Sequence, residues 1–318
     1  SSDLRGQPIP VPTEPEFFFN MTQEAAAKNF LVFKRYGFDL GRAIEAQKLS
    51  PLGYGSEFKK PEVLQKIFKN HPLWKRMERL LREGSRWPLK EISEKDRVAD
   101  LQEALKFGNH KGATSKPELL RKLITADVIH GYGLVIPLNK LERIPGACLA
   151  PMNIMHQFTL DASGDIVDKE RLTHDQSFKW QSGTSVNKRV IKEELQQCMY
   201  GRCLMRLLSW IVAARRKFPN KSIVIQKIDV KSAYRRCHMN AATAIQTITQ
   251  QPAEEMAIIM LRLTFGGAPC PFEWNIISES IRDLANAILY DDSWDPHSEY
   301  APCQHLVPPI DLMDDSIP

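Results

Sequence analysis

The chain has 318 residues, of which 43% are hydrophobic, 8% aromatic and 25% charged, and its formal net charge is +5. This mixture is typical of globular proteins and excludes a chain that is disordered throughout. No apolar run approaches the roughly 20 residues of a membrane-spanning helix, so we expect no membrane partner. The six cysteines form no zinc-type cluster, which favours free thiols inside the cell, in the cytoplasm or nucleus.

The charge is distributed unevenly along the chain. Residues 283–318 carry eight carboxylates and no Lys or Arg, so the residues before them carry +13. Residues 56–122 alone hold 17 basic and 10 acidic side chains. A basic body of this kind attracts polyanions such as nucleic acids, although helix faces that are simply solvated by Lys and Arg would give the same count.

The expected elements begin with an extended arm over residues 1–21, which has four prolines near its start, and a helical region over 22–130. Apolar residues three and four positions apart predict helices around 64–68 and 73–81. Ser115, followed by Pro117 and Glu118, predicts a capping box at the start of another helix.

After residue 131 the pattern favours strands. Residues 131–137 read as a strand, and the apolar runs 155–160 and 166–173 flank a glycine-containing turn, which predicts a β-hairpin. A long helix is then expected over 190–217, with Leu195, Met199, Cys203, Leu207 and Ile211 on its apolar face. We further expect a strand over 223–230, a helix to about 250, a strand over 257–263 and a helix over 269–289.

Three segments contain the residue types that carry chemistry. Asp229 ends a predicted strand, where a carboxylate can hold Mg²⁺ together with a backbone carbonyl, or can instead cap the following helix. Gly266 and Gly267 allow close approach of the backbone to a bulky group, or form a plain structural turn. Arg171 lies on a hairpin strand, where a guanidinium can clamp phosphate oxygens or can pair with Glu170 or Asp175. His174 and Asp175 could suggest a metal or acid/base pair, but adjacent strand residues point to opposite faces.

In this order, the three segments resemble the reverse transcriptases of retroelements. Asp229 with Ala233-Tyr234 looks like the first catalytic motif of that family, and Leu263-Thr-Phe-Gly-Gly-Ala-Pro269 looks like its next palm motif. Lys169-Glu-Arg171, with Asp175 four residues after the arginine, is similar to the fingers motif that precedes a Ser-x-Asn turn, which here ends at Asn187. The resemblance covers about residues 131–289 and does not extend to the helical first third.

The resemblance implies roles for individual residues. Asp229 would bind Mg²⁺ with help from the Val230 carbonyl, and Tyr234 would stack beneath the sugar and exclude a 2′-hydroxyl. Arg171 and Lys169 would neutralise the triphosphate, while Phe265 and Gly266 would shape the pocket. The implied reaction is attack of a primer 3′-oxygen on the α-phosphate of a dNTP, directed by an RNA template.

The family's third palm motif, an aromatic residue followed by two aspartates on a hairpin, is missing. Tyr290-Asp-Asp292 lacks a preceding strand, and Met313-Asp-Asp315 follows two prolines near the chain end. We therefore expect the motif beyond Pro318, in a longer polypeptide of which this chain is an excerpt that is inactive by itself.

The sequence thus predicts an α+β fold with a helical N-terminal region, 22–130, and an incomplete fingers and palm with an antiparallel sheet, 131–318, ending in the acidic segment 283–318. The expected function is that of a fragment of an RNA-directed DNA polymerase. Two alternatives stay open: a non-catalytic nucleic-acid-binding relative that uses the basic helices, and an unrelated α/β hydrolase or interaction module.

Overall fold

The structure, a computed structural model, describes residues 16–47, 52–161, 163–197, 203–225 and 230–289. It is a mixed α+β fold with two small antiparallel sheets. The helices are α1 (Gln23–Arg35), α2 (Leu40–Ala46), α3 (Pro61–Phe68), α4 (Trp74–Glu83), α5 (Glu94–Phe107), α6 (Lys111–Thr114), α7 (Pro117–Ile129), α8 (Val186–Arg189), α9 (Cys203–Lys217), α10 (Ala241–Ile245) and α11 (Cys270–Leu289). The strands are β1 (Gly133–Pro137), β2 (Met152–Leu160), β3 (Ile166–His174), β4 (Thr249–Gln251) and β5 (Met256–Met260). Short 3-10 helices are η1 (Leu138–Arg143), η2 (Lys192–Glu194), η4 (Ala233–Arg236) and η5 (Pro252–Glu254).

The helices of the first third form where the apolar periodicity predicts them, and several begin at residues that cap them. The side chains of Thr22 and Ser93 accept hydrogen bonds from amides in the first turns of α1 and α5. The capping box predicted at Ser115 is wrong, because α7 starts from Lys116 without a side-chain cap and Ser115 instead closes α6. Pro117 opens α7, as a residue without an amide hydrogen can.

The main sheet has the strand order β1-β5-β4, and both pairings are antiparallel. Its central strand β5 is buried throughout, which explains a run of apolar residues without alternation. The strands predicted over 131–137 and 257–263 are confirmed in position, although β5 ends at Met260. Beyond it, Arg262 forms an isolated bridge with His238.

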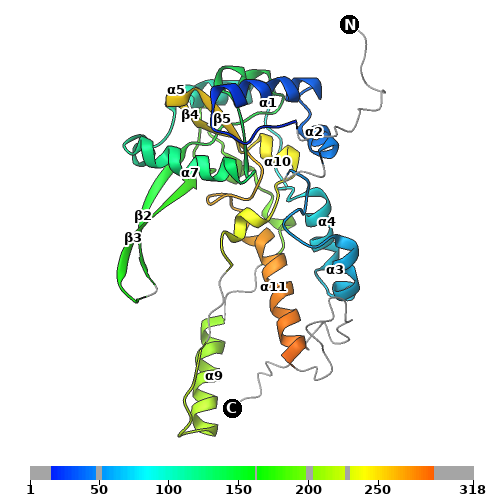
Figure 1. Ribbon diagram of the computed structural model, residues 1–318, viewed down its shortest axis with the longest axis vertical. Coiled ribbons are helices and arrows are strands. Elements are labelled where there is room, and N and C mark those ends of the chain that lie inside the picture. The colour runs from blue at the N-terminus through cyan, green and yellow to red at the C-terminus, as the bar shows by residue number, and fades with distance from the viewer. Residues whose placement is uncertain (1–15, 48–51, 162, 198–202, 226–229, 290–318) are drawn as a thin grey trace.

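The second sheet is the β2–β3 hairpin, whose register runs from Met152 opposite His174 to Leu160 opposite Ile166. The predicted hairpin is therefore confirmed. Its apolar side chains are exposed near the tip and buried near the base, where Met152, Ile154 and Leu172 join the core. Figure 1 shows the hairpin projecting from the body of the protein.

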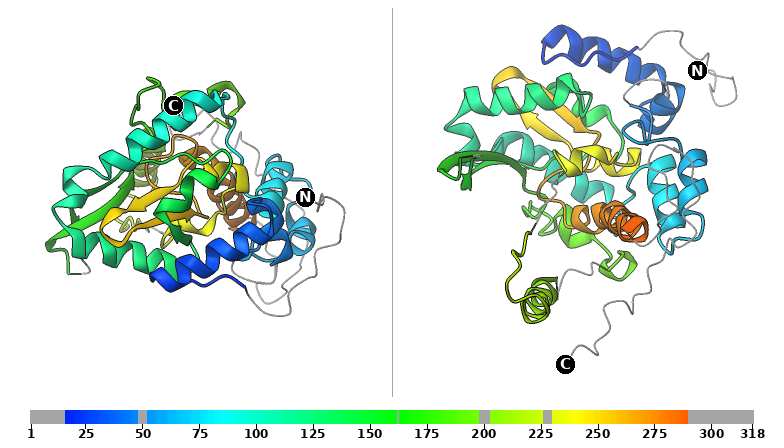
Figure 2. Two further views of the ribbon diagram at one scale, coloured as in Figure 1. Left: turned by 90° about the horizontal axis from the view of Figure 1, so that it is seen from above. Right: turned by 60° about the horizontal axis from the view of Figure 1, so that its bottom comes forward.

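Three predicted elements differ from the structure. The helix expected over 190–217 begins at Cys203, because the backbone at 190–191 hydrogen-bonds with residues 88–89 instead. Figures 1 and 2 show α9 set apart from the rest of the chain, and Leu207 on its expected apolar face is exposed.

The strand expected over 223–230 is not formed at 223–225, and 226–229 lie outside the described residues. The helix expected from there to about 250 is replaced by η4, α10 and β4. Tertiary contacts explain the difference. The backbone of residues 237–239 hydrogen-bonds with residues 261–263 on one side and with Ser85 on the other, so it cannot form a helix.

The helical region supports the main sheet directly. Asn29 of α1 is fully buried, and its Nδ2 donates to the carbonyl oxygens of Val135 on β1 at 3.0 Å and Phe18 at 2.9 Å. Its Oδ1 accepts from the Phe18 amide at 2.8 Å. Because β1 is an edge strand, this side chain pairs a backbone group that no neighbouring strand reaches.

Replacing Asn29 with alanine should lower the free energy of unfolding by about 1–3 kcal/mol, because the buried Val135 carbonyl loses its donor. Urea unfolding followed by circular dichroism measures this change. The exposed Asn70→Ala variant should stay within about 0.5 kcal/mol of the wild type. Equal stability of the two variants would contradict the anchoring role of Asn29.

Candidate functional site

The hairpin strand β3 places its basic side chains on one face. Lys169, Arg171 and Thr173 alternate with Glu170, Leu172 and His174 along the strand, and Leu172 and His174 are buried. Arg171 is half-buried at the inner part of the strand, and Lys169 is exposed two residues toward the tip. The two cations that the sequence singles out therefore share the face opposite to the buried one.

Arg171 lies against two other predicted site residues. Its guanidinium carbon is 5.7 Å from the centroid of the Phe265 ring, and Phe265 in turn contacts Tyr234 with the ring centroids 5.0 Å apart. Phe265 is 44% exposed, so this row of side chains borders solvent. We call Arg171, Phe265 and Tyr234 the Phe265 face. The structure thus brings together three predicted residues that lie far apart in the sequence.

The turn that carries Phe265 is fastened to the end of β3. The His174 amide donates to the Phe265 carbonyl at 2.8 Å, which extends the pairing of β3 by one bond. Asn187, at the start of α8, donates from Nδ2 to the Gly266 carbonyl at 2.8 Å and accepts at Oδ1 from the Ala268 amide at 2.7 Å. One carboxamide therefore satisfies both a donor and an acceptor of the turn.

The two glycines of the turn meet other parts of the chain. Gly266 has φ +122°, and a Cβ on it would lie 1.7 Å from the carbonyl oxygen of His174. A Cβ on Gly267 would lie 2.3 Å from the ring of Trp87, which is the planar group that this backbone approaches. The close approach expected from the sequence is thus made to the protein itself, and it fixes where Phe265 lies.

The segment after Asp229 is held by ion pairs. Val230 is 40% exposed, and Ser232 takes a left-handed conformation, φ 55°, that turns the chain into η4. Arg235 binds both carboxylate oxygens of Asp127 on α7, at 3.2 and 2.7 Å. Arg236 pairs with Glu57 at 2.7 Å. Both guanidiniums next to Tyr234 are therefore engaged with carboxylates of the helical region.

His174 and Asp175 have separate environments. His174 is fully buried, and neither ring nitrogen has a hydrogen-bond partner among the described residues. Burial, with a smaller effect of the nearby Arg235 charge, lowers the pKa of His174 from 6.5 to about 3. Asp175 instead pairs with His110, with Oδ2 and Nε2 3.0 Å apart. The two side chains do not converge on one site, as the alternation of the strand predicts.

The simple surface pair considered for Arg171 is not formed. Glu170 pairs with Lys116 and Asp175 with His110, and no described carboxylate forms an ion pair with Arg171. The guanidinium is thus available to an anion that approaches the Phe265 face.

The predicted metal ligand Asp229 lies outside the described residues, as do the two aspartate pairs at 291–292 and 314–315. Among the described residues, no group of three His, Cys, Asp or Glu side chains could hold a metal ion. These residues alone do not build a Mg²⁺ site, so the metal remains a prediction from the sequence.

Part of the basic charge between residues 56 and 122 is used inside the protein. Arg97 is buried and binds Glu94 and the Ala147 carbonyl, while Lys116 and Arg121 pair with carboxylates outside that stretch. The exposed remainder includes Lys69, Lys75 and Arg79 on or beside α3 and α4.

No protein-family model, curated protein or solved structure matches this chain. In the part of the chain that the structure describes, no helix is both long and apolar enough to cross a membrane.

Two features of this region were not predicted from the sequence. The role of Asn187 depends on backbone groups about 80 residues later, which no local pattern reveals. An aromatic cluster of Phe107, His110, Phe178 and Trp180 also forms beside the hairpin. The sequence shows aromatic residues at 107, 178 and 180, but nothing in it indicates that Phe107 meets the other two.

Replacing Gly266 with alanine should destabilise the fold more than the same change at Gly164. Gly164 also has a positive φ, +88°, but a Cβ there meets nothing within 4 Å, so its variant measures the conformational cost alone, about 1–2 kcal/mol. The Gly266 variant adds the clash with His174. Urea unfolding compares them, and equal losses would contradict the packed turn.

The buried His174 should make stability depend on pH. The unfolded chain takes up a proton on this histidine below about pH 6.5, whereas the folded chain does so only near pH 3, so stability falls as the pH drops between these values. His174→Phe should flatten this dependence by about 1.4 kcal/mol per pH unit. Urea unfolding from about pH 7 to pH 4 tests this, and parallel curves for variant and wild type would refute it.

Proposed function

We propose that this chain carries the fingers and part of the palm of an RNA-directed DNA polymerase. The proposal is supported above all by the Phe265 face, in which Arg171 from the hairpin, Phe265 from the glycine turn and Tyr234 from η4 lie in one row. These three residues come from the three segments that resemble reverse transcriptases. Such an enzyme would act inside the cell on an RNA template and a DNA primer.

The side chains of the Phe265 face are suited to hold a dNTP. Arg171 presents its guanidinium beside an exposed ring, and Lys169 is about 7 Å farther along the same face of β3, so both can reach one triphosphate. The rings of Tyr234 and Phe265, tilted by 41° to each other, offer an apolar surface for a sugar or base. Tyr234 is proposed to exclude ribonucleotides by occupying the space of a 2′-hydroxyl.

The proposal includes a Mg²⁺ site at Asp229 with the Val230 carbonyl. Magnesium would neutralise charge on the phosphates of a bound nucleotide. Val230 is 40% exposed and is followed by the left-handed turn at Ser232, which is compatible with a carbonyl open to a ligand. The part that the described residues themselves can perform is to bind and orient the nucleotide through Arg171 and the Phe265 face.

Binding of a fluorescent dNTP in the presence of Mg²⁺ tests the proposal. Arg171→Ala should weaken binding by about tenfold or more, because a hydrogen bond to a charged group contributes roughly 1.5–3 kcal/mol. The matched control is Arg143→Ala. Arg143 is an exposed arginine at the end of η1, which follows β1 in the chain and is not part of the Phe265 face. That variant should bind as the wild type does. Equal affinities for both variants would contradict the proposal.

A second candidate function is nucleic-acid binding without catalysis. It is favoured by the exposed cations on and beside α3 and α4, among them Lys69, Lys75 and Arg79. This function predicts duplex binding that weakens with salt and is unchanged by Asp229→Asn, together with no measurable affinity for a dNTP. Saturable dNTP binding that requires Arg171 would decide against it.

A further inference from the structure

Four aromatic side chains meet where the β2–β3 hairpin joins the body. Phe107 ends α5, His110 precedes α6, and Phe178 and Trp180 follow β3. The Phe107 ring centroid is 4.8 Å from that of Phe178 and 5.6 Å from that of Trp180. The centroids of Phe178 and Trp180 are 4.6 Å apart, and those of His110 and Phe178 are 5.2 Å apart. We call these four residues the aromatic platform.

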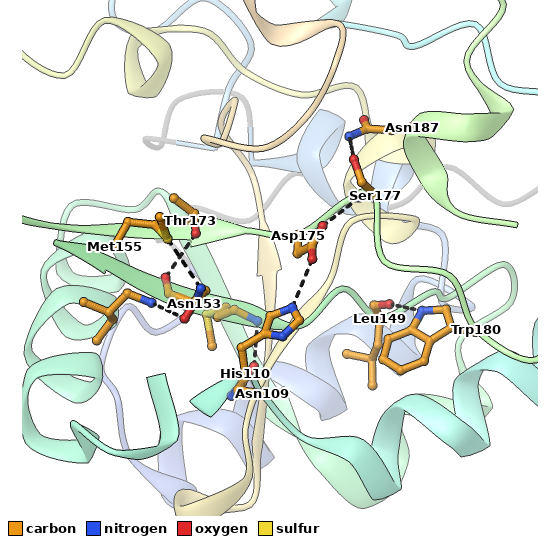
Figure 3. A network of polar contacts seen from close by, with 12 residues as sticks. Asn109, His110, Leu149, Asn153, Met155, Thr173, Asp175, Ser177, Trp180 and Asn187 are labelled. Carbon is orange, nitrogen blue, oxygen red and sulfur yellow. Dashed lines mark hydrogen bonds and ion pairs between the residues drawn. The ribbon is translucent and has the colours of Figure 1, made fainter. Parts of the chain in front are cut away.

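The platform is held rigidly on its inner side and open on its outer side. Trp180 donates from Nε1 to the Leu149 carbonyl at 3.1 Å, and His110 is tied to Asp175, as Figure 3 shows. Phe107, by contrast, is 43% exposed. Phe107 therefore packs against the rings of Phe178 and Trp180 and is still partly open to solvent. Stacking on such a ring costs little conformational entropy.

Exposed lysines and hydrogen-bonded carboxylates both lie next to the platform in the chain. Lys106, Lys111 and Lys179 are exposed next to its members, and no described carboxylate forms an ion pair with any of the three. The nearby carboxylates already have partners within the protein. Asp175 pairs with His110, Asp100 accepts from Ser182, and Glu103 accepts from the Gln181 amide. These carboxylates are held in place by hydrogen bonds within the protein, whereas the three lysines form no ion pair with a described carboxylate, so the lysines are the charged groups that can turn toward a phosphate.

We propose that the aromatic platform binds single-stranded nucleic acid, with a base stacked on Phe107 and the flanking phosphates near the three lysines. Aromatic rings beside a basic rim are the combination that single strands require, because every base has a face that can stack. An acidic peptide would match the lysines, but it would leave the exposed ring without an equivalent partner.

The platform is connected to the Phe265 face by a chain of hydrogen bonds. The Ser177 amide donates to Asp175 at 3.1 Å, and Asn187 donates to the Ser177 hydroxyl at 2.9 Å and to the Gly266 carbonyl at 2.8 Å. Figure 3 shows His110, Asp175, Ser177 and Asn187 in sequence. A strand stacked on Phe107 would thus lie on an element that is joined by this hydrogen-bond network to the turn that presents Phe265. The identification of this strand as the template rests on the proposed function. The stacking of a base on Phe107 does not depend on that function.

Fluorescence anisotropy with a labelled single-stranded RNA of about 12 nucleotides tests the inference, with an abasic strand of the same length as the second probe. The wild type should prefer the RNA over the abasic strand, and Phe107→Ala should weaken RNA binding by about tenfold while leaving abasic binding unchanged. Phe18→Ala is the matched control, because Phe18 is 41% exposed and also lies beside a lysine, Lys28. It should bind both probes as the wild type does.

Phe107→Trp keeps a stacking surface and should retain RNA affinity, which separates loss of the ring from damage to the fold. The inference is overturned if the wild type binds the abasic strand as tightly as the RNA, or if Phe107→Ala and Phe18→Ala have equal RNA affinity. Phe107→Ala should keep its dNTP affinity. If the wild type shows no dNTP binding that depends on Arg171 but the RNA results are as expected, the proposed polymerase function is refuted and the inference about the aromatic platform still holds.

Discussion

The contact between the end of β3 and the turn around Gly266 is the constraint on which the rest of the site depends. Asn187 binds Gly266 and Ala268 of this turn, and the His174 amide binds the carbonyl of Phe265, which directly precedes Gly266. Because Gly266 has no side chain, the turn approaches β3 closely enough for Phe265 to reach Arg171. A hairpin and a turn about 90 residues apart thereby become one surface.

The helical region contributes to this surface through ion pairs rather than through a side chain at the site. Arg235 joins η4 to Asp127 of α7, and Arg236 joins it to Glu57. Glu57 also lies 3.7 Å from the buried Arg262. Burial lowers the pKa of Arg262 to about 10, which is still high enough to leave it protonated at neutral pH, and the Glu57 charge opposes this lowering. Carboxylates of the first third therefore fix the segment that carries Tyr234. This gives residues 22–130 a physical role that their sequence alone did not reveal.

Local patterns predicted the elements whose burial follows a simple period. The β2–β3 hairpin, α11 and the early helices could be placed because their apolar residues alternate or recur within a single element. The segment from 190 to 250 could not, because its backbone pairs with distant residues, as at Val190 and His238. For the site, the resemblance of the three motifs in their order to reverse transcriptases was what implied a shared function for residues 171, 234 and 265. The contacts of Asn187 and the convergence of the aromatic platform arise only once the chain has folded.

A structure of this chain crystallised with a dNTP and Mg²⁺ tests the central claim most directly. The account predicts the triphosphate within hydrogen-bonding distance of the Arg171 guanidinium, with the nucleoside against Tyr234 and Phe265. A nucleotide bound elsewhere, or an empty Phe265 face at saturating nucleotide, would contradict it.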